Sequence, residues 1–369
     1  MRKLYEKDMV EILYGATLLG AGGGGSLKVG LKMLENLKAE GHTLEISLLN
    51  LDEIADDEYA VSVCSLGSPV EILNPEKPTF GPDAVHAFKA FQKAFAAEGK
   101  EVKYLVSGEM GGQNTCTPFL VSVLSDEDPD KRIPMVDVDN NGRACPELQT
   151  TLTTYWNHPP KPMGMGSMYG DEIIVYPTTD EAGEQIARQM CMLYGMRIGF
   201  STWGLNKAEM SEALCVGCLT QAQEIGHAIL SAKETGADVM SELKKVMEVR
   251  EFCRGTIEAL ETRSVGGFDC GTTVVRGDDG HKYFIDFKNE NLILRDESGE
   301  TILTAPEGIG LIDLDNNLPL TNADTYQGMR LLVTMTPAHP NWWDPERKPY
   351  ECWLPELEKL GMKGKQVRY

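Results

Sequence analysis

The sequence has 369 residues, of which 42% are hydrophobic, so it can bury large cores without disulfides, and its length favours two domains. Its formal charge of −21 would repel nucleic acid phosphates and anionic lipid heads, which makes nucleic acids and membranes poor candidate partners. No segment approaches the ~20 uninterrupted apolar residues of a membrane-spanning helix. The nine cysteines are scattered at irregular spacing, as is typical of reduced thiols, so we expect a cytoplasmic protein.

The first part of the chain alternates between predicted helices and strands. Apolar residues at helical spacing predict a helix over residues 9–20, with Asp8 as its N-cap and Gly20 as its stop. The elements expected after it are, in chain order, a helix at 27–37, strands at 44–51 and 59–66, a helix near 82–98, a strand at 102–107, a helix near 114–124 and a strand at 133–138. This alternation is typical of a mostly parallel sheet.

The second part of the chain has a different pattern. Residues 161–167 (KPMGMGS) resemble a loop, and the capping box of Asn206 and Glu209 predicts a long helix to about Ser231. The expected strands are at 173–176, 272–275, 283–287, 292–294, 311–314 and 331–334. We therefore predict an α/β fold. Residues 1–165 would form an N-terminal α/β domain with a mostly parallel sheet and a glycine-rich turn, and residues 166–369 a C-terminal α+β domain rich in short strands.

A glycine-rich segment follows the first predicted helix. Residues 20–25 fit the G-x-G-x-x-G spacing of dinucleotide-binding folds, but that fingerprint follows a strand, and here a helix precedes it. We therefore expect no nucleotide cofactor. Backbone N–H groups at a helix N-terminus bind carboxylates favourably. The residues expected to bind an anion in this way are Gly23, Gly24, Gly25 and Ser26.

Polar residues follow the predicted strand at 102–107. The string GEMGGQN places Glu109, Gln113 and Asn114 just beyond that strand, at the edge where open α/β sheets bind ligands. A glycine turn whose Asn or Gln caps the next helix explains the string equally well. Cys116 lies just beyond the turn and is a weaker candidate for a nucleophile.

The string VDVDNNGRACPELQ follows the next predicted strand in the same way. Asp137 and Asp139 point to the same side of a strand, where they could hold a divalent metal or position a base. A solvated turn with an internal pair of Arg143 and Glu147 is an equal alternative. Because the carboxyl ends of neighbouring parallel strands share an edge, we expect both loops to converge in one cleft.

Three other features favour structural roles. Cys215 and Cys218 form a C-x-x-C inside the expected long helix, without a second pair, so zinc or redox chemistry is not favoured. His339, in PAHPNWWD, is interpreted as a packed loop histidine. The sequence has neither a G-x-S-x-G elbow nor a Walker A motif, so the α/β-hydrolase and P-loop classes are unsupported.

Six distinctive strings are spread along the chain. They are GAGGGGS (20–26), GEMGGQN (108–114), VDVDNNGRACPELQ (136–149), GGFDCGTTVVRG (266–277), FKNENL (287–292) and APEGIGLIDLDNNLPLTNAD (305–324). In this order the chain resembles the S-methyl thiohydantoin desulfurase family over about residues 8–345. Cys145 stands where that family usually has an aromatic residue, and the tail after Trp343 is idiosyncratic.

The resemblance implies hydrolysis of an S-methyl thiohydantoin to a hydantoin, with release of methanethiol. Water must attack the ring carbon that carries the sulfur, which requires a general base, a group that steadies charge on the ring nitrogens, and an anchor for a substrate carboxylate. The candidate catalytic residues are Glu109 as base, Asn114 and Asp139. The candidate substrate-binding residues are Gly23, Gly24, Gly25, Ser26, Gln113, Arg143 and Glu147. The candidate ligands of a divalent metal are Asp137 and Asp139.

Two other functions fit the same residues. The chain could be a non-catalytic ligand-binding or regulatory partner of a hydantoinase-type enzyme, or a metal-dependent amidohydrolase of unmodified hydantoins. The expected partners are a small-molecule substrate and further copies of the chain in a homo-oligomer, which could function beside a hydantoinase-type enzyme.

Overall fold

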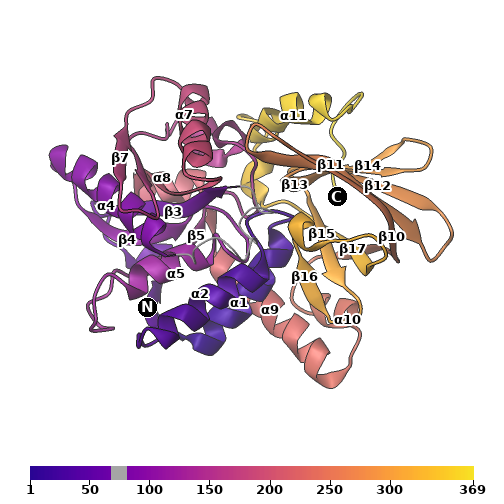
Figure 1. Cartoon of the computed structure of the whole chain (residues 1–369), viewed down its shortest axis with the longest axis horizontal. Coiled ribbons are helices and arrows are strands. Elements are labelled where there is room, and N and C mark those ends of the chain that lie inside the picture. Colours follow the sequence, from indigo (N-terminus) through magenta and orange to yellow (C-terminus); the bar gives the residue numbers. More distant parts are fainter. Residues whose placement is uncertain (68–80) are drawn as a thin grey trace.

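The computed structural model describes residues 1–67 and 81–369, which form two sheets lying side by side (Figure 1). In spatial order, the first sheet contains β1 (Arg2–Tyr5), β2 (Glu45–Leu49), β5 (Met135–Asp139), β4 (Val102–Ser107), β3 (Tyr59–Gly67), β8 (Arg197–Asn206), β6 (Met163–Gly166) and β7 (Glu172–Val175), with β9 (Cys215–Val216) paired to β5. The second contains β14 (Thr301–Thr304), β13 (Glu290–Asp296), β12 (Lys282–Lys288), β11 (Phe268–Gly277), β10 (Arg250–Val265), β17 (Arg330–Thr336), β15 (Gly308–Asp313) and β16 (Leu318–Leu320).

The centre of the first sheet is parallel. Strands β2, β5, β4 and β3 pair in parallel, whereas β1, β8, β6, β7 and β9 are joined to the sheet by antiparallel pairs. Every residue of β5 is buried, as expected for a strand covered on both faces. The carboxyl ends of β3, β4 and β5 consequently meet at one edge of the sheet.

Helices cover the first sheet and connect it to the second. They are α1 (Glu6–Leu19), α2 (Leu27–Ala39), α4 (Pro82–Ala97), α5 (Cys116–Val123), α6 (Leu152–Tyr155), α7 (Asp180–Leu193), α8 (Lys207–Ala213), α9 (Cys218–Thr235), α10 (Val239–Leu243) and α11 (Leu354–Lys359). Short 3₁₀ turns lie at Leu51–Glu53, Leu148–Thr150, Asn322–Asp324, Pro340–Trp343 and Pro349–Trp353. Within the described residues, no helix is long and apolar enough to cross a membrane.

Helices α1 and α9 pack closely along each other. A Cβ atom at Gly15 of α1 would collide with the backbone carbonyl of Ala222, and one at Gly226 of α9 would collide with that of Glu11. Helix α1 also contacts β15 and β16, so it holds the two sheets together. Figure 1 shows this helix, in indigo, beside the yellow strands of the second sheet.

The second sheet is antiparallel between all its paired strands. Its strands β10 and β11 form a long hairpin that turns at Gly266 and Gly267, both with positive φ. The hairpin tip reaches the first domain, where Arg188 of α7 donates to the carbonyl of Gly267 at 3.4 Å. The two-domain α/β class predicted from the sequence is confirmed, with parallel strands in the first sheet and antiparallel strands in the second.

Three local predictions are wrong. Asp8 is not the N-cap of α1, because the helix begins at Glu6 and the Asp8 carboxylate accepts from the backbone N–H of Tyr5 at 2.9 Å. Residues 161–167 are not a loop, since they contain strand β6. Its glycines pack directly on α4: a Cβ at Gly164 would collide with the backbone of that helix. These glycines therefore serve close helix–sheet packing rather than a turn.

The third wrong prediction is the long helix. The capping box at Asn206 is present, but α8 ends at Ala213 and the chain then forms β9 before α9 begins. Gly217, with φ +81°, makes the turn between β9 and α9. The C-x-x-C therefore lies at a strand–helix junction and not within a helix. The expected domain boundary at residue 165 falls within β6, a strand of the first sheet.

Candidate active site

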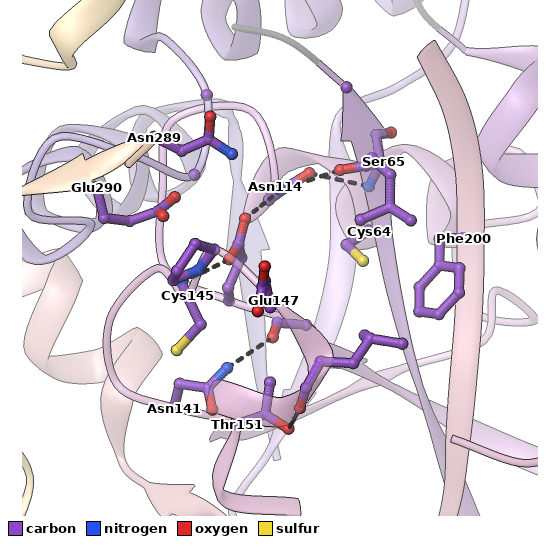
Figure 2. A pocket seen from close by; sticks show the side chains of 18 of the residues that line it. Cys64, Ser65, Asn114, Asn141, Cys145, Glu147, Thr151, Phe200, Asn289 and Glu290 are labelled. Atoms are coloured by element: carbon purple, nitrogen blue, oxygen red, sulfur yellow. Dashed lines mark hydrogen bonds between the residues drawn. The ribbon is translucent and has the colours of Figure 1, made fainter. Parts of the chain in front are cut away.

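A cavity opens where the carboxyl ends of β3 and β4 meet the glycine-rich turn and the start of β13. Its empty space amounts to about 700 Å³, a figure that includes solvent at its open mouth. Its lining includes Gly24, Gly25, Cys64, Glu109, Gln113, Asn114, Cys145, Glu147, Glu184, Arg188, Phe200, Trp203, Asn289 and Glu290. In Figure 2, Asn289 and Glu290 lie on one side of the cavity, and Cys64 and Phe200 on the other.

Glu109 follows β4 and is held by two donors. Its Oε1 accepts from the side-chain amide of Asn114 at 2.6 Å, and its Oε2 accepts from the backbone N–H of Cys145 at 3.0 Å. Burial raises the pKa of Glu109, whereas these two donors and the positive charges of Arg188 and Arg143 counteract that rise. The result is a carboxylate fixed in direction but partly withdrawn from water, which suits a general base.

Asn114 is itself held rigidly. Its Oδ1 accepts from the N–H of Ser65 at 3.0 Å, and its amide donates to the carbonyl of Ser65 at 3.3 Å as well as to Glu109 (Figure 2). The Asn114 side chain therefore bonds both the N–H and the carbonyl of Ser65 in β3, and it orients the Glu109 carboxylate that follows β4. It is a positioning residue for Glu109.

Glu290 is a further carboxyl group in the same cavity, besides Glu109, Glu147 and Glu184, and no sequence pattern indicated a role for it. It is the first residue of β13, its side chain is 2% exposed, and its Oε2 has no hydrogen-bond partner among the described residues. Burial, followed by the charge of Glu109, raises the pKa of Glu290 well above its ordinary value. The string FKNENL contains it, but only the docking of the second domain brings it to the cavity.

Arg188 of α7 is the cation among the described residues that line the cavity. Its Nε donates to Glu184 Oε1 at 2.6 Å and its Nη2 donates to the carbonyl of Pro146 at 2.8 Å. Its guanidinium also lies 4.1 Å from the centre of the Phe268 ring. Arg188 therefore links α7 to the loop after β5 and to the β10–β11 hairpin. Nothing in the sequence pattern of α7 marks this arginine as a cavity residue.

The glycine-rich turn follows helix α1, as predicted, so the strand–turn–helix setting of a dinucleotide site is absent from it. Gly24 and Gly25 line the cavity and have positive φ angles of 70° and 80°. Gly23 lies behind Glu290, because a Cβ atom there would collide with Glu290 Oε1. Ser26 does not line the cavity: it accepts from the N–H of Lys28 at 3.2 Å as the N-cap of α2.

The loop after β5 contributes Cys145 and Glu147 to the cavity, but the two aspartates of β5 itself do not line it. Asp137 caps α9, since its Oδ1 accepts from the N–H of Leu219 at 2.8 Å. Asp139 accepts from the N–H groups of Asn141 and Gly142, and burial raises its pKa to about 7. In the parts of the chain that the structure describes, no three His, Cys, Asp or Glu side chains form a metal-binding group.

Arg143 also lies outside the cavity lining. It donates to the carbonyls of Pro306 at 3.0 Å, Glu307 at 2.8 Å and Asn291 at 3.2 Å, all in the C-terminal domain. Its guanidinium stacks 4.8 Å from the centre of the Trp353 ring. The residue therefore locks the two domains together and acts on Glu109 only through its charge.

The remaining predicted residues are placed as follows. Gln113 lines the cavity, and Glu147 lines it while pairing with Lys288. Cys116 is fully buried in α5, and burial raises the pKa of its thiol, which disfavours a nucleophile. His339 caps a 3₁₀ turn, where its Nδ1 accepts from the N–H of Asn341 at 3.3 Å.

Comparisons with known proteins agree with this architecture. Residues 7–177 match the family described as S-Me-THD-like, N-terminal domain, and residues 178–350 match its C-terminal domain. No curated protein matches the chain. Among solved structures, the X-ray structure of a protein from Chromobacterium violaceum matches with a TM-score of 0.82 and 21% identity over 100% of both chains, a likeness that shows the fold.

Proposed function

The chain belongs to the S-methyl thiohydantoin desulfurase (S-Me-THD-like) family, and from this premise we propose that it hydrolyses small cyclic ureide-like rings. The substrate is an S-methyl thiohydantoin, and the products are the hydantoin and methanethiol. The observation that carries the proposal is Glu109, a partly buried carboxylate whose two oxygens are fixed by Asn114 and Cys145 at the edge of a small cavity.

The reaction needs water to attack the ring carbon bonded to sulfur. Glu109 removes a proton from that water as the carbon–oxygen bond forms, and the carbon–sulfur bond then breaks. Thiolate is a much better leaving group than a ring amide, so a fixed base in a small cavity fits this ring better than an unmodified hydantoin. General base catalysis of this kind contributes ~100- to 10,000-fold to a rate.

The cavity supplies the other contacts that the ring requires. Phe200 and Trp203 of β8 provide apolar surface, and Asn289 and Gln113 provide amides that can bond to ring oxygen and nitrogen. Arg188 takes the anchoring role for a substrate carboxylate, because it lines the cavity and its two Nη atoms, which donate to the carbonyls of Gly267 and Pro146, each carry a second N–H group, although its charge is paired with Glu184. Gly24 and Gly25 let the substrate approach the backbone closely.

The test is incubation of the purified protein with a 5-substituted S-methyl thiohydantoin. We expect methanethiol, detected with a thiol reagent, to appear in equal amount with the sulfur-free hydantoin. Parallel reactions with a chelator and with added divalent metal distinguish a metal-dependent amidohydrolase. If neither the thioether nor the unmodified hydantoin is turned over under any of these conditions, a ligand-binding or regulatory function replaces the proposal.

A further inference from the structure

We propose that Glu290 is the proton donor of this site and that it works with Glu109 as a pair of carboxyl groups lining one cavity, Glu290 protonated and Glu109 ionised. The inference rests on the proposed function for its reaction step, but the pair itself can be detected without substrate. Glu290 comes from the C-terminal sheet and Glu109 from the N-terminal sheet, so the pair exists only where the two domains meet.

The two carboxyl groups have opposite surroundings. Both oxygens of Glu109 accept N–H donors, which favours its ionised form. Among the residues that the structure describes, no side chain or backbone group donates to Glu290 Oε2, although that oxygen is buried. A buried carboxyl oxygen without a donor is best accommodated as the hydroxyl of a neutral acid, because an ionised one would lose its hydration without replacement.

The charges around the pair support one proton rather than none or two. The charged and titratable groups acting on Glu290 are Glu109 after β4, Arg143 after β5 and Arg188 on α7. Glu184 is already paired with Arg188 through a 2.6 Å contact, and Arg143 is engaged by carbonyls of the second domain. Two positive charges, on Arg143 and Arg188, thus face three carboxyl groups, Glu109, Glu184 and Glu290, which favours the neutral form for one of the three.

The fold also keeps space for Glu290. Gly23 leaves room for its carboxyl group, since any larger side chain at this position would occupy the place of Oε1. Asn289, in the left-handed region at φ +56°, makes the tight turn that begins β13 at Glu290, and its Oδ1 is fixed by the N–H of Asp269 at 2.9 Å. Three features from separate parts of the chain thus position one side chain.

The pair divides the reaction between its members. Glu109 accepts a proton from water while oxygen bonds to the ring carbon, and Glu290 gives its proton to the ring nitrogen that was doubly bonded to that carbon. The carbon–sulfur bond then breaks as the new hydroxyl group becomes the hydantoin carbonyl and returns its proton to Glu290, and the proton held by Glu109 leaves with the thiolate as methanethiol. Water and the thioether are consumed, the hydantoin and methanethiol are formed, and both carboxyl groups return to their starting states.

The kinetic test compares Glu290→Gln with the wild type over a range of pH. The wild type should give a bell-shaped profile of kcat/KM, with the acid limb from Glu109 and the alkaline limb from Glu290. Glu290→Gln can still donate a hydrogen bond but cannot transfer a proton, so turnover should fall ~100-fold or more and the alkaline limb should disappear. An alkaline limb that persists unchanged in Glu290→Gln overturns the proposal.

The substrate-free test uses infrared difference spectra at neutral pH. Wild type minus Glu290→Gln should contain the C=O stretch of one protonated carboxylic acid, and in Glu109→Gln that band should titrate at lower pH because the neighbouring charge is gone. Glu307→Gln, a buried glutamate outside the cavity, is the matched control for both tests. A wild type that turns over no thiohydantoin yet shows this band refutes the proposed function and supports the pair; absence of the band refutes the pair.

Discussion

The side-chain amide of Asn114 donates to Glu109 Oε1 at 2.6 Å while the same side chain is bonded to both backbone groups of Ser65. Strand β3 thus fixes, through Asn114, the orientation of Glu109, which follows the neighbouring strand β4. Because this donor favours the ionised form of Glu109, its removal should change the pKa of the carboxyl group while Glu109 itself is kept.

We therefore expect Asn114→Ala to raise the pKa of Glu109. A hydrogen bond to a charged group contributes roughly 1.5 kcal/mol, so the acid limb of the kcat/KM profile should move up by about one pH unit. Ser122→Ala is the matched control, because it loses a 2.6 Å hydrogen bond from the following helix to the carbonyl of Ile133, and Ser122 does not line the cavity. An acid limb at the same pH in Asn114→Ala would contradict Glu109 as the titrating base.

Glu109→Gln should abolish most of the turnover. Glutamine retains the shape of the side chain but cannot accept a proton, so kcat should fall by ~100- to 10,000-fold. Its amide NH2 group would face one of the two N–H donors that bond to Glu109, so the melting temperature should fall as well. Release of methanethiol measures the loss, and Glu307→Gln controls for replacing a buried glutamate elsewhere. Wild-type turnover in Glu109→Gln would show that another group is the base.

Glu290→Gln should stabilise the protein, and increasingly so as the pH rises. The pKa of Glu290 is raised in the folded state above its ordinary value of 4.5, so the folded state keeps a proton that the unfolded chain releases. The contribution of Glu290 to the free energy of unfolding is therefore fully present below about pH 4.5. It is lost as the pH rises towards the folded pKa, by at most ~1.4 kcal/mol per pH unit. Melting temperatures across this pH range should diverge; parallel curves would place the ionisation elsewhere.

Arg143→Ala should mainly reduce the stability of the fold. It leaves the carbonyls of Pro306, Glu307 and Asn291 without their donor, which should cost on the order of 3 kcal/mol. Denaturant unfolding measures this loss. A variant that folds as stably as the wild type but binds carboxylate-bearing substrates more weakly would instead make Arg143 the substrate anchor.

Asp137→Ala tests the aspartate pair as metal ligands. Because Asp137 caps α9, its loss should cost about 1 kcal/mol of stability and leave kcat unchanged. Metal content of the purified protein, measured before and after dialysis against a chelator, completes the experiment. A loss of bound metal and of turnover in Asp137→Ala would restore the metal site.

Local patterns predicted the elements that bear the acids, because β3, β4 and β5 are short apolar runs and the polar loops follow them directly. Glu109 and Asn114 could be found in this way. Glu290 and Arg188 could not, since the first depends on docking of the second domain and the second on the packing of α7. The charge of Arg143 was evident from the sequence, but its carbonyl acceptors lie more than a hundred residues away.

The close approach of Gly23 and Glu290 limits how the two halves of the chain can be exchanged between relatives. Arg143 binds backbone carbonyls, which any C-terminal half provides, so this link tolerates a foreign partner. The Glu290 carboxyl group, by contrast, fits only because Gly23 has no side chain. The two residues belong to different family domains, which meet at residues 177 and 178. A hybrid protein that combines a larger residue at position 23 from one parent with glutamate at position 290 from another would have a steric clash inside its cavity.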